Sequence, residues 1–244
     1  MTDRTVTTAV VLAAGEGTRL RPRTADRPKP LVEVDGTPIL TRCFETLIDL
    51  GIREAVVVVG YRHEAIVERY GAAYRDLDVQ YAHQAERDGL AHAVLAAEGH
   101  VDADFVVVNG DNVYSANLPA ALDRHAESTA DVTFPVEEVP REEAGGGAVC
   151  ELDDDGAVTG LVEKPDDPPS TLVPAAFYVL PPEVFPACRI VRPSERGEYE
   201  LADAIDLLIH AGYRVETVPF EGWKVNVNTE DDIERAERLL AREG

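Results

Sequence analysis

The residues with the clearest potential for chemistry lie between Leu12 and Pro30, in the sequence LAAGEGTRLRPRTADRPKP. An apolar run ends at Ala14 and is followed by a turn of small residues, Gly15-Glu16-Gly17-Thr18-Arg19. Small residues let backbone N–H groups approach an anion closely, and turns of this kind form anion-binding nests. Arg19 adds a fork of donors suited to phosphate oxygens, and Lys29 adds a mobile point charge. The segment therefore predicts a site for nucleotide phosphates.

Two better-known phosphate loops are excluded by the residues that follow Gly17. A P-loop requires Gly-Lys-Ser/Thr, whereas Gly17 precedes Thr18-Arg19, and the dinucleotide fingerprint requires a third glycine where Leu20 stands. The missing glycine weakens the alternative of an NAD-dependent dehydrogenase. A glycine turn before a surface loop is the simpler alternative if the glycines are taken alone.

A metal site is predicted around Asp111, which follows an apolar run and a glycine. Its carboxylate is a hard oxygen ligand of the kind that suits Mg²⁺, which completes its shell with water and substrate phosphates. Asn226 offers a neutral oxygen as a second ligand. The alternatives are a turn-capping role for Asp111 and a structural role near Asn226, where Thr229 is the predicted N-cap of the last helix.

Two further segments carry polar groups suited to substrate binding. Gln84 and Gly89 lie in a loop before a helix, where an amide can pair with a base edge and a glycine lets a flat ring approach the backbone. Taken alone, this pattern is weak. Glu163 and Lys164 end a predicted strand and put a hydroxyl acceptor beside a phosphate-binding cation. The six histidines show no metal-ligand spacing, and we interpret them as surface or satisfied core residues.

The elements that must position these residues alternate between strands and helices in the first half of the chain. Apolar runs predict strands at Thr8–Leu12, Ala55–Val59, Val79–Ala82 and Phe105–Val108. Helical spacing predicts helices at Pro38–Leu50, His63–Tyr74 and Leu90–Ala97. This alternation indicates βαβ units and a largely parallel sheet, in which ligands gather at the carboxyl ends of the strands.

The second half of the chain predicts a mixed sheet joined to the first half without a flexible linker. Strands are expected at Asp131–Val139, Val149–Leu152, Val158–Glu163, Ala175–Leu180 and Val215–Pro219. Helices are expected at Glu200–His210 and Asp231–Arg242.

Composition narrows the classes of partner. The chain has 46 acidic and 23 basic residues and a formal net charge of −23, which disfavours binding to nucleic acid or to anionic membranes. The three cysteines are well separated and include no CxxC pair, which predicts neither a disulfide framework nor a zinc site. No signal-peptide pattern opens the chain, and no apolar run reaches the roughly 18 residues of a membrane helix. We therefore expect a cytoplasmic protein without nucleic-acid or membrane partners.

The same acidic charge, spread along the chain, predicts a halophilic protein. Salt screens the repulsion between carboxylates, because the Debye length falls to about 3 Å at 1 M. Raising KCl from about 0.1 to about 2 M should therefore raise the melting temperature. A melting temperature that does not change over this range would contradict the prediction.

In combination, these motifs resemble the sugar-1-phosphate nucleotidylyltransferases, and most closely the short glucose-1-phosphate uridylyl- and thymidylyltransferases. The resemblance covers nearly the whole chain, in family order, through LAAGEGTRLRP, RPKPLVEVDGTPIL, VVVVGY, GLAHAV, NGDNVY, VEKPDDPPS, RGEYELADAI and WKVNVNTEDD. It implies a Rossmann-like three-layer α/β/α fold with a mostly parallel mixed sheet. The expected organisation is one nucleotidyltransferase domain, 1–244, with a nucleotide-binding half at 1–130 and a sugar-phosphate-binding half at 131–244.

The resemblance also implies a reaction and a set of site residues. The reaction is the Mg²⁺-dependent transfer of a nucleoside monophosphate from an NTP to a sugar 1-phosphate, with release of pyrophosphate. The nucleotide would be held by Leu12, Ala13, Ala14, Gly15, Gly17, Thr18, Gln84, Gly89 and Asn112. The catalytic residues would be Arg19 and Lys29 on the triphosphate and Lys164 on the sugar phosphate. The metal ligands would be Asp111 and Asn226, and the sugar phosphate would be held by Ala148, Glu163, Lys164 and Ala176.

Three positions depart from the family pattern. Ala148 and Ala176 stand where the family commonly has glycine, and Asn226 stands where the second metal ligand is usually aspartate. The alanines would crowd the sugar or change its choice, and the asparagine would bind the metal more weakly. UTP or dTTP and glucose 1-phosphate are the favoured substrates. The alternatives are a mannose-1-phosphate guanylyltransferase and a non-catalytic regulatory homologue that binds a nucleotide sugar, and a homo-oligomer is left open.

Overall fold

The computed structural model describes residues 4–243, which form two compact units that interleave along the chain. We call them the β1 unit (residues 7–87, 108–116 and 221–243) and the β9 unit (residues 4–6, 88–107 and 117–220). Strand β7 (Phe105–Asn109) begins in the β9 unit and ends in the β1 unit. Within residues 4–243, no helix combines the length and the apolar character needed to span a membrane.

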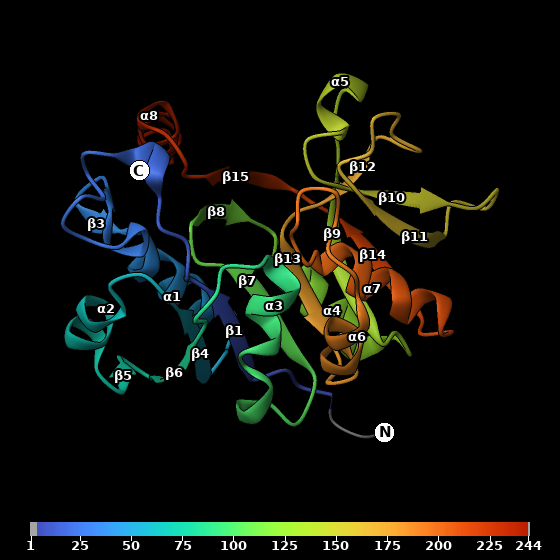
Figure 1. Ribbon diagram of the computed structural model, residues 1–244. Coiled ribbons are helices and arrows are strands. Elements are labelled where there is room, and N and C mark those ends of the chain that lie inside the picture. The colour runs from blue at the N-terminus through green and yellow to red at the C-terminus, as the bar shows by residue number, and fades with distance from the viewer. Residues whose placement is uncertain (1–3, 244) are drawn as a thin grey trace. The chain divides into compact units, whose positions relative to one another are not determined.

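The β1 unit is built on three parallel strands, β1 (Thr8–Leu12), β4 (Glu54–Val59) and β6 (Leu77–His83). The short strand β5 (Ala73–Tyr74) pairs antiparallel with β6. Helices α1 (Ile39–Asp49) and α2 (His63–Tyr70) connect successive parallel strands, so the predicted βαβ units are present (Figure 1). Valine-rich strands such as β4 are buried along nearly their whole length, as a sheet covered on both faces requires.

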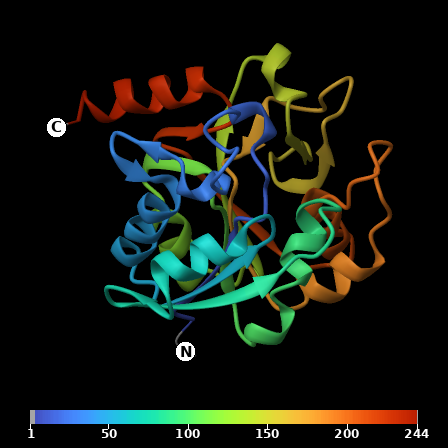
Figure 2. The ribbon, with the colours of Figure 1, turned by 60° about the vertical axis from the view of Figure 1, so that its left-hand side comes forward.

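A second group of elements in the β1 unit includes the loop after β1. This group consists of the short helices η1 (Thr18–Leu20) and η2 (Lys29–Leu31), the hairpin β2–β3, the antiparallel pair β8–β15 and helix α8 (Glu230–Leu240). The strands are β2 (Glu33–Val34), β3 (Thr37–Pro38), β8 (Asn112–Ala116) and β15 (Gly222–Asn226). Helix α8 packs on β15 and β2, as Figure 2 shows. These elements share one core of Leu20, Val32, Val34, Ile39, Val113, Val225, Val227, Ile233 and Ala236.

The β9 unit is organised around β9 (Val132–Glu138) (Figure 1). This strand pairs antiparallel with β12 (Leu172–Pro174) and β13 (Phe177–Leu180), and parallel with β14 (Val215–Pro219). A separate ribbon is formed by β10 (Ala148–Leu152) and β11 (Val158–Glu163). The helices are α3 (Leu90–Leu95), η3 (Glu98–His100), α4 (Pro119–Glu127), α5 (Arg141–Ala144), α6 (Val184–Ile190) and α7 (Leu201–His210). Helix α7 packs on both β11 and α6.

The predicted α/β class with a mixed, mostly parallel sheet is confirmed, with local corrections. The helix expected at His63–Tyr74 ends at Tyr70, because Gly71 leaves the helical region at φ 59° and the next residues form β5. The strand expected at Ala175–Leu180 begins only at Phe177, because Ala176 has a φ of 57°. The hairpin and several short elements, including β8, β15, α4 and α6, were not predicted.

The interior holds the three cysteines and one of the histidines. The three cysteines are free and buried, and burial raises the pKa of each thiol to about 12, so all three stay protonated. His125 is fully buried within the β9 unit, and its ring nitrogens lie 3.0 Å from Thr133 Oγ1 and 3.1 Å from Asp104 Oδ2. It is a satisfied core histidine.

Candidate active site

The loop after β1 is shaped by Gly17. This residue adopts the left-handed conformation (φ 67°, ψ 39°) at the start of η1, and Thr24 Oγ1 donates a 2.7 Å hydrogen bond to its carbonyl oxygen. A Cβ at Gly17 would lie 2.9 Å from the Cβ of Lys29. Glycine is therefore required here both by the backbone conformation and by the close approach of Lys29.

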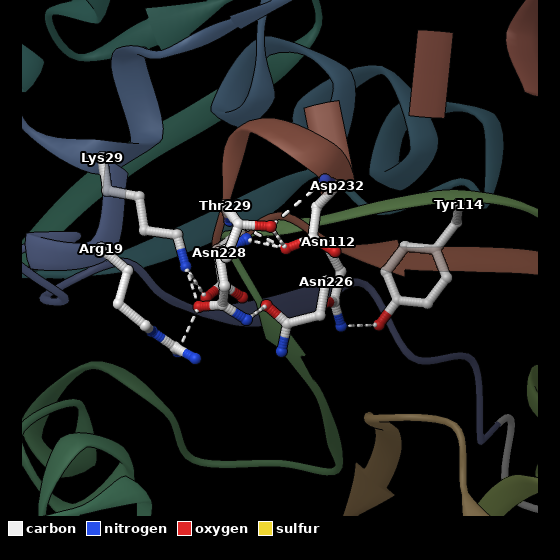
Figure 3. A network of polar contacts seen from close by, with 9 residues as sticks. Arg19, Lys29, Asn112, Tyr114, Asn226, Asn228, Thr229 and Asp232 are labelled. Atoms are coloured by element: carbon white, nitrogen blue, oxygen red, sulfur yellow. Dashed lines mark hydrogen bonds and ion pairs between the residues drawn. The ribbon is translucent and has the colours of Figure 1, made fainter. Parts of the chain in front are cut away.

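Lys29 is the central cation of the β1 unit. It is only 4% exposed, and its Nζ donates to Asp111 Oδ2 at 2.6 Å and to Asn228 Oδ1 at 2.8 Å. Arg19 Nη2 donates to the same Asn228 oxygen at 2.8 Å, so both cations converge on one amide (Figure 3). The acceptor that the two cations share carries no net charge. It therefore leaves positive charge at this place available to bind an anion. The structure thus brings together the predicted triphosphate residues.

The predicted metal ligands lie on segments that are directly hydrogen-bonded: Asp111 is in the turn before β8, and Asn226 ends β15. Asn226 pairs with Asn112 in the β8–β15 ladder, and Val227 N donates to Asp111 O at 3.0 Å. Their side chains offer one carboxylate and one amide oxygen, which are hard ligands of the kind Mg²⁺ takes.

A further observation fits a hydrated cation or a substrate hydroxyl at this place. Asn112 is 1% exposed; its Nδ2 donates to Tyr114 Oη at 2.8 Å, but its buried Oδ1 has no partner. A buried oxygen without a donor is costly, and metal-bound water or a hydroxyl group would supply one. Among residues 4–243 no group of three or more His, Cys, Asp or Glu side chains is placed to hold a metal ion, so a cation held by Asp111 and Asn226 would take its other ligands from substrate and water.

The other predicted nucleotide residues of the β1 unit line the ends of its strands. Gly110 N donates to Leu12 O and Ala13 N to Val58 O, both at 2.9 Å, which ties the Asp111 turn to the end of β1. Ala14, Gly15 and Thr18 continue this loop. Gln84 follows β6 and is 5% exposed, and its backbone N–H donates a hydrogen bond to Val59 O at 2.9 Å.

Glu16 belongs to the same loop and is held by two arginines. It accepts from Arg87 Nη1 at 2.7 Å and from Arg21 Nη2 at 2.8 Å. The hydrogen bond from Arg87 is the main reason that the pKa of the Glu16 carboxyl is lowered, and Arg21 adds to the effect. Glu16 therefore stays ionised and fixes the loop beside the glycines.

In the β9 unit, the β10–β11 ribbon brings three predicted residues together. Ala148 lies opposite Glu163 in the ladder, and Lys164 N donates to Gly147 O at 2.9 Å. Lys164 turns out of the strand at φ 44°, a conformation that non-glycine residues adopt at a cost and that often marks a functional position. Its Nζ lies 3.2 Å from Glu163 Oε1.

The environment of Glu163 includes two residues that the sequence analysis did not assign. Arg196 Nη2 lies 3.8 Å from Glu163 Oε1 and donates to Glu200 Oε1 at 3.0 Å. Glu200 precedes α7 and has a side chain only 4% exposed. Burial raises the pKa of the Glu163 carboxyl, Glu200 raises it further, and Lys164 and Arg196 oppose the shift.

The backbone conformation at position 89 requires glycine. Its φ of 110° is unsuited to other residues, and a Cβ there would lie 2.4 Å from Tyr199 O. Tyr199 N donates to Asp88 O and Tyr199 O accepts from Ala91 N, so the start of α3 is clasped to this segment. The predicted contact of Gly89 with the base stays a prediction.

Ala176 occupies a backbone position that favours glycine, as the family pattern implies. Because a non-glycine residue at its φ of 57° costs roughly 1–2 kcal/mol, Ala176→Gly should relieve that strain. The greater freedom of glycine in the unfolded chain offsets about 0.4–1 kcal/mol of the gain. We expect the free energy of unfolding, measured by chemical denaturation, to rise by between about 0 and 1.6 kcal/mol.

The neighbouring alanine provides the matched control for this substitution. Ala175 is fully buried and does not have a positive φ, so Ala175→Gly should lower the free energy of unfolding by roughly 1 kcal/mol. Equal losses in the two variants would contradict the strain at Ala176.

The polar residues that the sequence analysis missed are Asn228 in the β1 unit and Arg196 and Glu200 in the β9 unit. Asn228 lies two residues after the predicted ligand Asn226, in a segment interpreted as a helix cap. Arg196 and Glu200 lie inside the family motif RGEYELADAI but had been given no role. Within each unit the predicted cations and carboxylates come together.

A parallel sheet with cations and oxygen ligands at the carboxyl ends of its strands is typical of α/β proteins that bind nucleotides. Residues 8–241 match the family described as Nucleotidyl transferase. The chain belongs to this family, and its assignment as a sugar-1-phosphate nucleotidylyltransferase is confirmed.

Three comparisons define its similarities further. The chain is 50% identical over 235 residues to the UTP–glucose-1-phosphate uridylyltransferase AglF of Haloferax volcanii, covering 96% of this chain and 97% of that protein. It is 37% identical over 232 residues to a glucose-1-phosphate thymidylyltransferase of Streptomyces antibioticus, covering 93% of this chain and 64% of the relative. A crystal structure of UDP-glucose pyrophosphorylase complexed with UDP-glucose matches with a TM-score of 0.86 at 21% identity, over 98% of this chain and 100% of that one, which supports the fold.

Proposed function

We propose that this protein transfers UMP from UTP to glucose 1-phosphate in the presence of Mg²⁺, giving UDP-glucose and pyrophosphate. The observation that carries the proposal is the cluster that Arg19, Lys29 and Asp111 form with Asn228 in the β1 unit. We propose UTP and not dTTP as the nucleotide, because the uridylyltransferase relative is 50% identical and matched over nearly its full length.

The residues of the β1 unit would bind the nucleotide. Arg19 and Lys29 would bind triphosphate oxygens with the donors that Asn228 and Asp111 leave free, and would neutralise their charge. Asp111 and Asn226 would hold the magnesium ion, which when bound neutralises further charge on the phosphates. The loop from Leu12 to Thr18, with Gln84, would hold the base and ribose.

The residues of the β9 unit would bind the acceptor. Lys164 would grip the phosphate of the sugar and Glu163 would accept hydrogen bonds from its hydroxyl groups. The sugar phosphate oxygen is itself the nucleophile: it forms a bond to the α-phosphorus of UTP while the bond to the pyrophosphate oxygen breaks. Positioning and charge neutralisation supply the catalysis, and no protein nucleophile is required. The protonated, buried cysteines agree with this.

We also propose a reducing and salt-rich cytoplasm as the setting of this reaction. The free cysteines and the excess of acidic residues support this proposal.

The test is a matrix of pyrophosphate release in Mg²⁺ and high KCl. The nucleotides are UTP, dTTP, GTP, ATP and CTP, and the acceptors are the 1-phosphates of glucose, galactose, mannose and N-acetylglucosamine. We expect release with UTP and glucose 1-phosphate, and loss of that release in Asp111→Asn. Release with GTP and mannose 1-phosphate instead would overturn the choice of substrates. If calorimetry showed that the protein binds a nucleotide sugar but no pyrophosphate were released with any pair, the protein would be a regulatory binder and not an enzyme.

A further inference from the structure

Asn228 links the cations of the β1 unit to a predicted metal ligand. Its Oδ1 accepts from Lys29 Nζ and Arg19 Nη2, each at 2.8 Å, and its Nδ2 donates to Asn226 Oδ1 at 2.7 Å (Figure 3). One short side chain therefore touches the triphosphate residues on one side and the metal residue on the other.

The chemistry of the donors fixes how both amides are turned. Lysine and arginine side chains only donate hydrogen bonds, so Asn228 must present its oxygen to them and its NH₂ group to Asn226. That NH₂ group needs an acceptor, so Asn226 must in turn present its oxygen to Asn228. The orientation of Asn226 is thus set by the cations, through Asn228.

The backbone of Asn228 is held independently of these contacts. Asn228 N donates to Asp232 Oδ2 at 2.9 Å, and the same carboxylate forms the capping box of α8 with Thr229. The preceding residue, Val227, is fully buried in the core shared by η1, β8, β15 and α8. The side chain of Asn228 therefore projects from a fixed point.

We propose that Asn228 is a positioning residue that turns the carbonyl oxygen of Asn226 toward the magnesium ion. The inference rests on the proposed function, in which Asp111 and Asn226 hold that ion. A carboxylate has an oxygen on either side, whereas an amide has one oxygen and one NH₂ group that repels a cation. A chain with asparagine at this position needs a device that selects the oxygen, and Asn228 supplies it.

The experiment is a double-mutant cycle that measures metal binding in the full-length protein. The variants are Asn228→Ala, Asn226→Asp and the two combined. The readout is the affinity for Mn²⁺, titrated by electron paramagnetic resonance in the presence of α,β-methylene-UTP. Asn228→Ala should weaken Mn²⁺ binding by about 10- to 100-fold when residue 226 is Asn, as loss of an outer-shell partner does. When residue 226 is Asp, the same substitution should weaken it by less than about threefold, because no orientation has to be selected.

The cycle separates positioning from the other contacts of Asn228. Loss of its hydrogen bonds to Arg19 and Lys29 affects both backgrounds alike and cancels. Equal losses of Mn²⁺ affinity in the two backgrounds would therefore overturn the inference. Asn228→Ser repeats the cycle with a shorter polar side chain and must give the same ratio, which guards against a folding defect in the alanine variant.

Two controls complete the design. Thr229→Ala removes the side-chain cap of α8 but leaves both amides, so it should lower the melting temperature without a comparable loss of Mn²⁺ affinity. If it weakened Mn²⁺ binding as much as Asn228→Ala, a purely structural role would be shown. If Asp111→Asn bound Mn²⁺ as tightly as the wild type, the proposed metal site and the inference would both fall. If that control behaved as expected but the cycle showed no coupling, only the inference would fall.

Discussion

Replacing Lys29 with methionine is expected to lower the rate of pyrophosphate release by at least about 10²–10³-fold, while the free energy of unfolding changes little. The ammonium group is one of the two cations that we propose bind the triphosphate, and loss of one such donor has effects of this size. Methionine has a similar length but no charge, so it fills the buried position without the cost of desolvation. Steady-state kinetics and chemical denaturation of the same preparation measure both quantities.

Asp111→Asn should give a different pair of results. Activity is lost as well, but Lys29 then keeps its buried charge and loses its carboxylate partner. Removing one partner of a buried ion pair leaves an uncompensated charge. Because Asp111 is 27% exposed, we expect the free energy of unfolding to fall by roughly 2–4 kcal/mol, at or below the usual range for such a change. Two inactive variants, of which only one is unstable, would identify Lys29 as the buried member of the pair.

An exposed arginine on the same loop is the matched control. Arg23 pairs with Glu230 at 2.7 Å, and both side chains are about half exposed. Arg23→Met should cost no more than about 1 kcal/mol and leave activity within about threefold. A Lys29→Met variant that retained more than a tenth of the wild-type rate would contradict the proposed role of Lys29.

The parts of the fold that the sequence predicts are those with local patterns. The β1 and β14 strands have the predicted bounds, Thr8–Leu12 and Val215–Pro219, because an apolar or alternating run between turn residues is visible in the sequence itself. Thr229 is the N-cap of α8 as predicted, because a capping residue lies next to the helix it caps.

The parts that the sequence could not predict depend on distant partners. Strands β8 and β15 are short, and each exists because it pairs with the other across about a hundred residues of chain. The same separation hides Asn228, whose contacts with Arg19 and Lys29 span 209 and 199 positions. A neutral amide before a helix cap has an adequate local explanation, so nothing in the sequence calls for a second one.

The sites show a similar division. The cations Arg19, Lys29 and Lys164 were predicted because a charged residue next to a glycine turn or a strand end is chemically conspicuous. The pairing of Glu200 with Arg196 was not, because the burial of a carboxylate is a tertiary property. Gly89 was assigned to the base, whereas the structure adds a backbone contact with Tyr199 that no sequence pattern shows.

Replacing Lys164 with methionine is expected to lower kcat/KM for the sugar 1-phosphate by about 10²–10³-fold and to leave nucleotide affinity nearly unchanged. Lys164 belongs to the β9 unit and contacts Glu163, whereas the predicted triphosphate residues belong to the β1 unit. Its side chain is 37% exposed, so its loss should cost little stability. Steady-state kinetics with the sugar phosphate and calorimetry with UTP separate the two substrates.

The control for this charge removal is Arg141→Met, which breaks an exposed pair with Asp167 in the same unit. It should change neither parameter by more than about twofold. A Lys164→Met variant that lost affinity for UTP and for the sugar phosphate to the same extent would contradict a role confined to the acceptor.

The pH profile of the same variant tests the partnership of Lys164 with Glu163. Burial and Glu200 already raise the pKa of the Glu163 carboxyl, and Lys164 opposes them by favouring the ionised form. Without Lys164 the pKa of the Glu163 carboxyl rises further, so the carboxylate proposed to accept hydrogen bonds from the sugar is protonated at a higher pH. The acid limb of kcat/KM should therefore move to higher pH in Lys164→Met and stay in place in Arg141→Met. An acid limb that moved to lower pH would show that Lys164 does not stabilise the ionised form of Glu163, and its role would then be limited to binding the phosphate.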